Sequence, residues 1–253
     1  MQIPQHLNSP LMKKLLLAVA VLAAALSSGA VAQVPITNVI TNAFDFGANY
    51  GGGGEPGWTN GADAGFGFGA WTISASGGGS AGAFIGNPTA GGIGGMSTES
   101  FGLYAHSAGD ARVGGSRSLS TALAIGETFS FQWGANYNAG AKGINFKSSG
   151  TQMFNFNVGG GSDNVTLNTV PVLTAYGTNS FYIGITRVDS GTYNLYSTSS
   201  RNSTSGGGFS TNLSSVLALN SLEIYAANVG QDDAQQPYFN NFSVTAVPEP
   251  STY

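Results

Sequence analysis

Large apolar side chains alternate with polar ones in five stretches of this chain. Successive side chains of a strand point to opposite faces, so an apolar residue at every second position predicts a strand with one buried face. The five sets are Phe129, Phe131 and Trp133; Phe154, Phe156 and Val158; Phe181, Ile183 and Ile185; Tyr193 and Leu195; and Leu222, Ile224 and Ala226.

Further strands are predicted where short apolar or β-branched runs stand between Gly, Asn and Ser. Asp189-Ser190-Gly191 separates 181–188 from 192–196 and predicts a hairpin. No helical period occurs after residue 32, and so many strands need two packed sheets. We therefore expect an all-β fold, a two-sheet antiparallel sandwich of jelly-roll or concanavalin-like type. The additional strands are expected at 70–75, 82–86, 100–106, 111–119, 143–147, 164–168 and 237–245.

The first 32 residues read as a leader that ends in a secretory signal peptide. Lys13 and Lys14 precede an apolar run at 15–26, and Ala30-Val31-Ala32 is a small-residue cleavage signal. The apolar run is too short for the ~20 residues of a spanning helix. We expect cleavage before Gln33, which leaves one β-sandwich domain at 33–246.

The carboxyl-terminal segment 247–253 carries a recognisable pattern, Val247-Pro248-Glu249-Pro250-Ser251. It resembles the start of the PEP-CTERM sorting signal of Gram-negative exported proteins. The resemblance implies a secreted or cell-surface location and processing by an exosortase. The family signal continues into a hydrophobic helix and a basic cluster, which this sequence does not reach. An ordinary Pro-rich tail is the alternative.

Two segments of the body, Gly67–Thr72 and Phe101–Tyr104, are similar to the Gly/Asn-rich β-sandwich modules of bacterial secreted proteins. Composition agrees with a packed, weakly charged domain, because 39 of 253 residues are glycine and only 8% are charged, while 42% are hydrophobic. A net charge of −4 gives no basic surface for nucleic acid. The absence of cysteine excludes disulfides and Cys-ligated zinc.

No catalytic residue is assigned. Ser80 fits a G-x-S-x-G pattern, but the strand-to-helix turn that this motif requires is not predicted, and His106 is the only histidine after the leader. The paired Glu/Asp spacing of retaining glucanases is missing. Glu223 points away from the core in Leu222-Glu223-Ile224-Tyr225, where a solvated carboxylate is the simplest interpretation. A glycan-active hydrolase or lyase whose acids come from distant strands stays open.

Asp232 and Asp233 bring two carboxylates together before the last strand. Calcium is held by six to eight oxygens, and Asn240 or backbone carbonyls would complete its shell. A structural Ca²⁺ site is thus one interpretation, and an exposed acidic turn is the other.

The positions opposite the apolar sets are almost uncharged amides and phenols. If their strands adjoin in one sheet, these side chains offer the donors, acceptors and flat rings that bind neutral glycans. Trp58 lies in a turn-rich loop where it would stack on a sugar or pack locally, whereas Trp71 and Trp133 are expected in the core. We therefore expect a non-catalytic protein that binds a neutral extracellular polysaccharide or forms part of a matrix; a self-associating surface protein and a simple solvated face are the alternatives. The predicted carbohydrate-binding residues are Trp58, Gln132, Asn155, Asn157, Tyr182, Asn194, Tyr196 and Tyr225.

Overall fold

The alternating apolar sets form strands and turn inward, as predicted. In the computed structural model every member of the five sets except Phe181 is at most 2% exposed. The structure describes residues 40–51, 57–106, 109–173, 177–198, 208–230 and 232–246. These residues belong to one compact unit that starts at Asn38.

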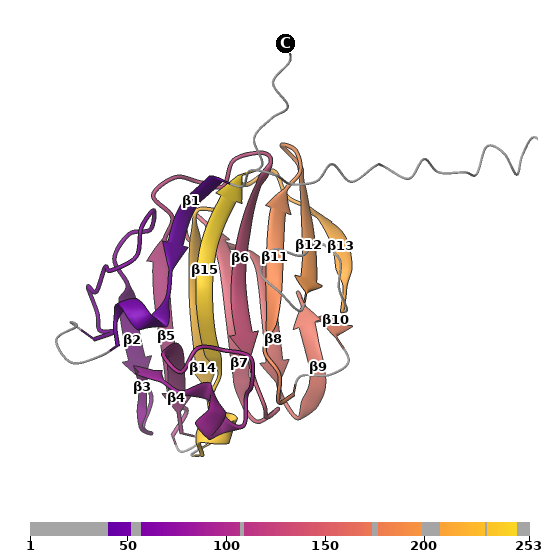
Figure 1. Ribbon diagram of the computed structural model, residues 1–253. Helices are drawn as coiled ribbons and strands as arrows, with labels where there is room; N and C mark the ends of the chain where they lie inside the picture. Colours follow the sequence, from indigo (N-terminus) through magenta and orange to yellow (C-terminus); the bar gives the residue numbers. More distant parts are fainter. Residues whose placement is uncertain are drawn as a thin grey trace, which may run out of the picture. The chain divides into compact units, whose positions relative to one another are not determined.

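The strands form two antiparallel sheets, so the predicted fold class is confirmed (Figure 1). In Figure 1 the eight-stranded sheet lies in front of the seven-stranded one. In spatial order the eight-stranded sheet contains β13 (Ser210–Ser214), β12 (Thr192–Thr198), β11 (Phe181–Arg187), β6 (Glu127–Gly134), β15 (Tyr238–Ala246), β4 (Ser100–Ala105) and β3 (Ala81–Gly86), with β1 (Ile40–Asp45) paired to β15. The seven-stranded sheet contains β10 (Val170–Leu173), β9 (Ser162–Leu167), β8 (Thr151–Gly159), β7 (Ala141–Ser148), β14 (Ser221–Ala227), β5 (Arg112–Ser118) and β2 (Thr72–Ser76).

The predicted hairpin joins β11 to β12, where the Val188 N–H donates to the Thr192 carbonyl at 2.9 Å. Among the residues that the structure describes, three short 3-10 helices lie in connections: η1 (Gly47–Asn49), η2 (Pro88–Gly91) and η3 (Asp233–Gln235). Among the described residues no helix has the length and apolarity to cross a bilayer. The predicted leader and the Val247–Ser251 motif lie outside the described residues.

Strand β15 has three neighbours. It pairs with β6 along most of its length, with β4 at Tyr238 and Phe239, and with β1 from Phe242 onward. The register shifts at Asn241, whose φ of 54° is left-handed. Such a bulge turns the strand locally, so one strand changes its partner from β4 to β1.

Aromatic rings from both sheets meet in the core. Phe131 on β6 lies 6.1 Å from Phe242 on β15 and 5.7 Å from Phe146 on β7 in the opposite sheet, measured between ring centroids. Trp133 stacks on Phe239 at 5.9 Å. The sandwich is therefore held by burial of these large side chains, as a chain without cysteine requires.

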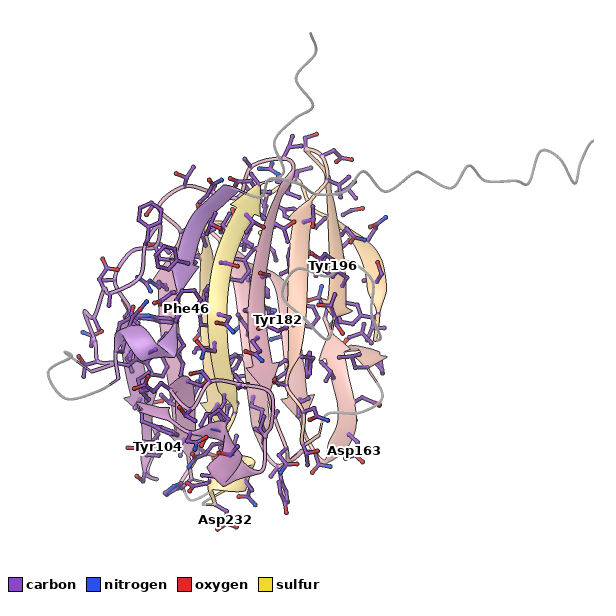
Figure 2. All side chains as sticks on the ribbon, in the orientation of Figure 1. Phe46, Tyr104, Asp163, Tyr182, Tyr196 and Asp232 are labelled. Carbon is purple, nitrogen blue, oxygen red and sulfur yellow. The ribbon has the colours of Figure 1, made fainter. Side chains whose placement is uncertain are left out.

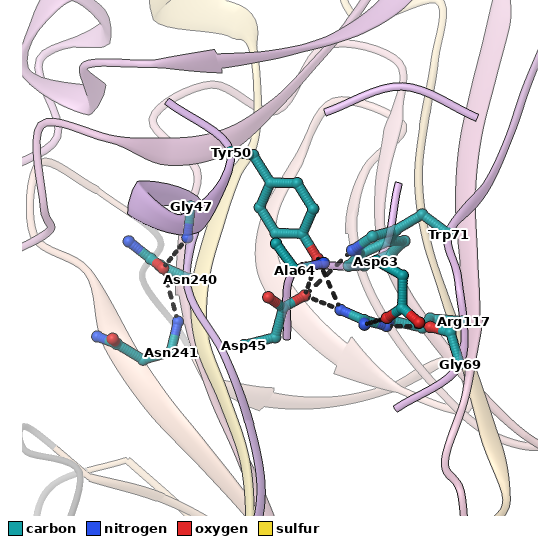
Figure 3. Close-up of polar contacts among 10 residues, drawn as sticks. All are labelled: Asp45, Gly47, Tyr50, Asp63, Ala64, Gly69, Trp71, Arg117, Asn240 and Asn241. Atoms are coloured by element: carbon teal, nitrogen blue, oxygen red, sulfur yellow. Dashed lines mark hydrogen bonds and ion pairs between the residues drawn. The ribbon is translucent and has the colours of Figure 1, made fainter. Parts of the chain in front are cut away.

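Two cations interrupt this apolar core. Arg117 on β5 forms an ion pair with Asp45 on β1 of the other sheet and a second with Asp63 at 2.5 Å (Figure 3). Trp71 Nε1 and the Tyr50 hydroxyl also donate to the same Asp45 oxygen, at 3.1 and 3.2 Å. This Arg117 cluster thus ties the two sheets together at one end.

The second cation is Lys142, which shares the inward parity of Ile144 and Phe146 on β7. Its residue is 0% exposed, and its Nζ donates to the Gln235 carbonyl of η3 at 2.8 Å. Burial lowers the pKa of Lys142 to about 8. The contact attaches the η3 segment to the seven-stranded sheet.

Candidate functional site

The predicted amides and phenols do not share one sheet, so that part of the sequence prediction is wrong. The set divides because pairing between distant strands assigns β6, β11 and β12 to one sheet and β7, β8 and β14 to the other. Alternation still points all of them outward. Gln132, Tyr182, Asn194 and Tyr196 lie on the outer face of the eight-stranded sheet, and Asn155, Asn157 and Tyr225 lie on the outer face of the seven-stranded sheet.

On the eight-stranded sheet, Tyr196 lies across Gly184, its register partner on β11. If residue 184 had a side chain, its Cβ would lie within 2.6 Å of three atoms at the hydroxyl end of Tyr196, so only glycine leaves room for the ring. The hydroxyl bonds the side chains of Thr186 and Thr128, and burial raises the pKa of Tyr196. The ring is therefore held low over the sheet in the neutral, hydrogen-bonding form while it stays partly exposed.

Tyr182 is two residues from Gly184 on the same face, and Figure 2 shows it beside Tyr196 on the strands nearest the viewer. Its hydroxyl accepts from Asn241 Nδ2 at 3.1 Å. The hydroxyls of Thr128 and Thr186 lie partly exposed on the same face and are hydrogen-bonded to each other at 2.7 Å. The structure therefore brings two phenols and several hydroxyls together on an uncharged patch.

Two further rings on this face were missed from the sequence. Phe84 on β3 lies over Gly102 on β4, and Tyr104 on β4 lies over Gly82 on β3. A Cβ added at either glycine would lie within 2.8 Å of three atoms of the facing aromatic side chain. The two rings are 6.1 Å apart and partly exposed. The repeated glycines were visible in the sequence, but their pairing with a ring requires the register.

The amides of this face have structural partners. Gln132 is 3% exposed, because the segment after η2 covers it: its Nε2 donates to the Gly95 carbonyl and to Ser180 Oγ at 2.7 Å. Its Oε1 accepts from Asn241 at 2.8 Å. Gln132 is thus not an exposed sugar-binding residue, which corrects that prediction. Asn194 is partly exposed and donates to Asn212 Oδ1 on β13 at 2.8 Å.

On the seven-stranded sheet the predicted residues form one hydrogen-bond chain. Asn155 Nδ2 donates to the Tyr225 hydroxyl at 3.0 Å and to Asn145 Oδ1 at 2.7 Å. The Tyr225 hydroxyl donates to Asn157 Oδ1 at 2.9 Å. Tyr225 faces Gly143 and Gly114 on its two neighbouring strands, so no side chain stands beside it in register. Three strands therefore present fixed polar groups in a row.

Glu223 continues this chain at a charged end. Its Oε2 accepts from Asn145 at 3.1 Å and from Lys147 at 2.6 Å, and its Oε1 lies 3.8 Å from Arg112. Burial raises the pKa of Glu223, but the hydrogen bonds from Lys147 and Asn145 and the charges of Lys147 and Arg112 outweigh it, so the net shift is downward. Glu223 is thus an ionised anchor rather than the solvated carboxylate expected from the sequence.

The structure also corrects Trp58. It is 4% exposed and packs edge-on against Trp71 at 5.3 Å and Phe101 at 4.9 Å. It cannot stack on a ligand from the core. Trp71 and Trp133 lie in the core, as predicted.

The three residues predicted to hold calcium are not brought together as a ligand set. Asp232 and Asp233 are exposed at η3, and Figure 2 shows Asp232 at the edge of the molecule. Asn240 is instead buried, and its side-chain oxygen accepts from the Gly47 and Asn241 N–H groups (Figure 3). Its side-chain nitrogen donates to the Glu99 carbonyl and to Ser100 Oγ. Within the described ranges no group of three His, Cys, Asp or Glu residues converges on a metal position.

A cavity of about 170 Å³ lies at the end of the eight-stranded sheet. Glu127 is the carboxylate in its lining, together with Asn42, Ser120 and Thr121. Both carboxylate oxygens are engaged, one by Asn42 Nδ2 and the other by the Ala124 N–H at 2.8 Å. The lining therefore lacks the pair of carboxylates that glycoside hydrolysis uses.

No family model and no curated protein matches this chain. Among solved structures, the Trypanosoma cruzi calreticulin globular domain matches with a TM-score of 0.43 and 9% identity over 69% of this chain and 82% of its own. An endo-acting O-glycanase of the human gut microbiota matches with a TM-score of 0.42 and 7% identity, over 59% of this chain and 80% of its own. The HCR/D F1240A mutant matches with a TM-score of 0.36 and 13% identity over 71% of this chain. The match covers only 44% of the length of that protein. Scores this low carry no functional argument.

Proposed function

We propose that this chain is an exported, non-catalytic β-sandwich protein that binds a neutral extracellular polysaccharide. The site is the outer face of the eight-stranded sheet, where Tyr182, Tyr196, Phe84 and Tyr104 lie. The proposal includes secretion through the leader and recognition of the Val247–Ser251 motif by an exosortase. Calcium at Asp232 and Asp233 stays a prediction, and Asn240 is no longer part of it.

The observation that supports this function most is the placement of rings over glycines. Tyr196, Phe84 and Tyr104 each lean over a paired glycine on the neighbouring strand. A ring in this position keeps one face against the sheet and turns the other toward solvent. Sugar rings expose apolar C–H groups that pack on such faces, and the adjacent hydroxyls and amides satisfy sugar hydroxyls.

The carboxylates support a binding rather than a catalytic role. A general acid needs a pKa near the working pH, whereas Glu223 has a lowered pKa and is bonded to a lysine. A lyase needs a base, and burial raises the pKa of Tyr225, which disfavours the phenolate. Neither group is tuned for proton transfer.

Replacing Tyr196 by Ala should lower affinity for the bound polysaccharide about threefold to tenfold, because one aromatic contact of roughly 0.5–1.5 kcal/mol is lost. Tyr182→Ala and Tyr104→Ala should each act in the same direction. Affinity electrophoresis of the full chain in gels containing xylan, glucan or galactomannan measures this, with and without calcium.

Tyr137→Ala is the matched control, since Tyr137 is 47% exposed in the connection between β6 and β7. Retention of the wild-type chain by none of these neutral polysaccharides would refute the proposed function. Shortened or unsaturated sugar products after long incubation would show instead that the protein is an enzyme.

A further inference from the structure

The outer face of the seven-stranded sheet differs from the other face in carrying charge. Arg112, Glu223 and Lys147 lie on its adjacent strands β5, β14 and β7, with two cations around one carboxylate. This trio has a local charge of +1, although the whole chain has −4. At physiological salt the Debye length is about 8 Å, so the trio rather than the net charge decides what binds there.

Within the trio, Lys147 and Glu223 are committed to each other while Arg112 is not. Lys147 Nζ lies 2.6 Å from Glu223 Oε2, whereas the nearest Arg112 nitrogen is 3.8 Å from Oε1. The Arg112 side chain is 53% exposed, and it donates no hydrogen bond within the part of the chain that the structure describes. Its guanidinium lies 5.7 Å from the centre of the Tyr225 ring. Tyr225 and Glu223 therefore position a guanidinium whose donors are available.

The groups beside Arg112 are neutral and already oriented. Tyr225 leads across Gly143 to Asn155 and Asn157 through bonds of 2.9–3.0 Å. Tyr225 is only 7% exposed and its hydroxyl is occupied by these two bonds. The partly exposed amides of Asn155 and Asn157 are therefore the groups that this row offers to the hydroxyls of a bound chain. A guanidinium pairs with a planar carboxylate through two parallel hydrogen bonds. A cation followed by two amides matches a ligand that carries both carboxylate and hydroxyl groups.

We propose that this face binds an acidic polysaccharide, with Arg112 pairing with a uronate carboxylate and Asn155 and Asn157, which the buried Tyr225 hydroxyl holds in place, contacting the adjacent sugar hydroxyls. The site lies on the opposite sheet from the proposed neutral-glycan surface and does not depend on it. The two faces would then recognise chains of different chemistry.

The proposal is tested by measuring how the full chain binds three polymers: polygalacturonate, its methyl ester and polyglutamate. The wild type should bind polygalacturonate at 0.05 M NaCl and lose affinity toward 0.5 M NaCl. Methyl esterification leaves the sugar backbone and removes the charge, so it should abolish binding. Polyglutamate has carboxylates without sugar hydroxyls and should bind at least tenfold more weakly.

Arg112→Gln should lower affinity for polygalacturonate about tenfold or more, and Arg112→Lys should recover only part of it because the fork is lost. Tyr196→Ala, on the other sheet, should leave this affinity unchanged. Circular dichroism should show unchanged melting for both Arg112 variants, whose side chain is exposed. Equal binding of the Arg112→Gln variant, equal binding of polyglutamate, or no binding by the wild type would each overturn the proposal.

Discussion

Replacing Arg117 by Met should lower the free energy of unfolding at pH 7 by about 3–5 kcal/mol, which is the cost of leaving a buried charge without its partner. Asp45 is 0% exposed and would keep only Tyr50 and Trp71 as donors. Burial raises the pKa of Asp45, and the Arg117 charge offsets part of that rise. Urea unfolding of both proteins measures the difference.

The pH dependence of the unfolding free energy tests whether the unpaired Asp45 carboxylate causes the loss of stability in Arg117→Met. Without Arg117 the pKa of Asp45 should rise further, so the folded variant binds a proton that the unfolded chain releases near the ordinary value of 3.8. Its stability should therefore fall as pH rises from 4 to 7, and its deficit should be smallest near pH 4. The double variant Arg117→Met with Asp45→Asn should regain most of the loss. A double variant as unstable as the single one would contradict this account.

In the wild type, the free energy of unfolding should rise by about 3 kcal/mol above pH 8, and Lys142→Met should remove this rise. The folded pKa of Lys142 is about 8 and the ordinary value is 10.5. Between these values the unfolded chain holds more protons, so wild-type stability should rise with pH, by up to about 1.4 kcal/mol per unit. The variant has no buried ammonium group and should be flat in this range and more stable at pH 7.

The free energy of unfolding, measured by denaturation at pH 8, 9 and 10, tests this prediction below the pH at which tyrosine ionisation affects stability. Burial raises the pKa of Tyr50 and Tyr225, and that of Tyr238 to about 12, so the folded state keeps their protons and stability should fall above pH 10. Lys147→Met is the control, because its side chain is 25% exposed and the rise should persist. A flat wild-type profile from pH 8 to 10 would rule out a buried, shifted Lys142.

Most strands and their buried faces were predictable because alternation is a local property, whereas β1, β10 and β13 were missed. Phe129 and Phe131 point inward in any sheet that contains them, and the hairpin between β11 and β12 needs only a short turn. The inward direction of the two buried cations also follows from alternation. Arg117 is on the same face of β5 as Val113, and Lys142 is on the same face of β7 as Ile144.

The candidate site was less predictable because it depends on which strands adjoin. Tyr182 and Tyr225 both have outward parity, and nothing near either residue indicates that β11 and β14 belong to different sheets. The ring-over-glycine pairs depend on register in the same way. Trp58 was misplaced for another reason: a turn-rich surrounding does not show whether a side chain folds back onto Trp71.

The three neighbours of β15 have a consequence for how the chain folds. The last described strand separates β1 and β4 from β6, and Ile40 pairs with Ala246 at the far end of the sequence. This sheet cannot be completed until β15 has left the ribosome, and pairings so distant in sequence form slowly. The apolar faces of β4 and β6 must therefore be shielded from aggregation until β15 has been made.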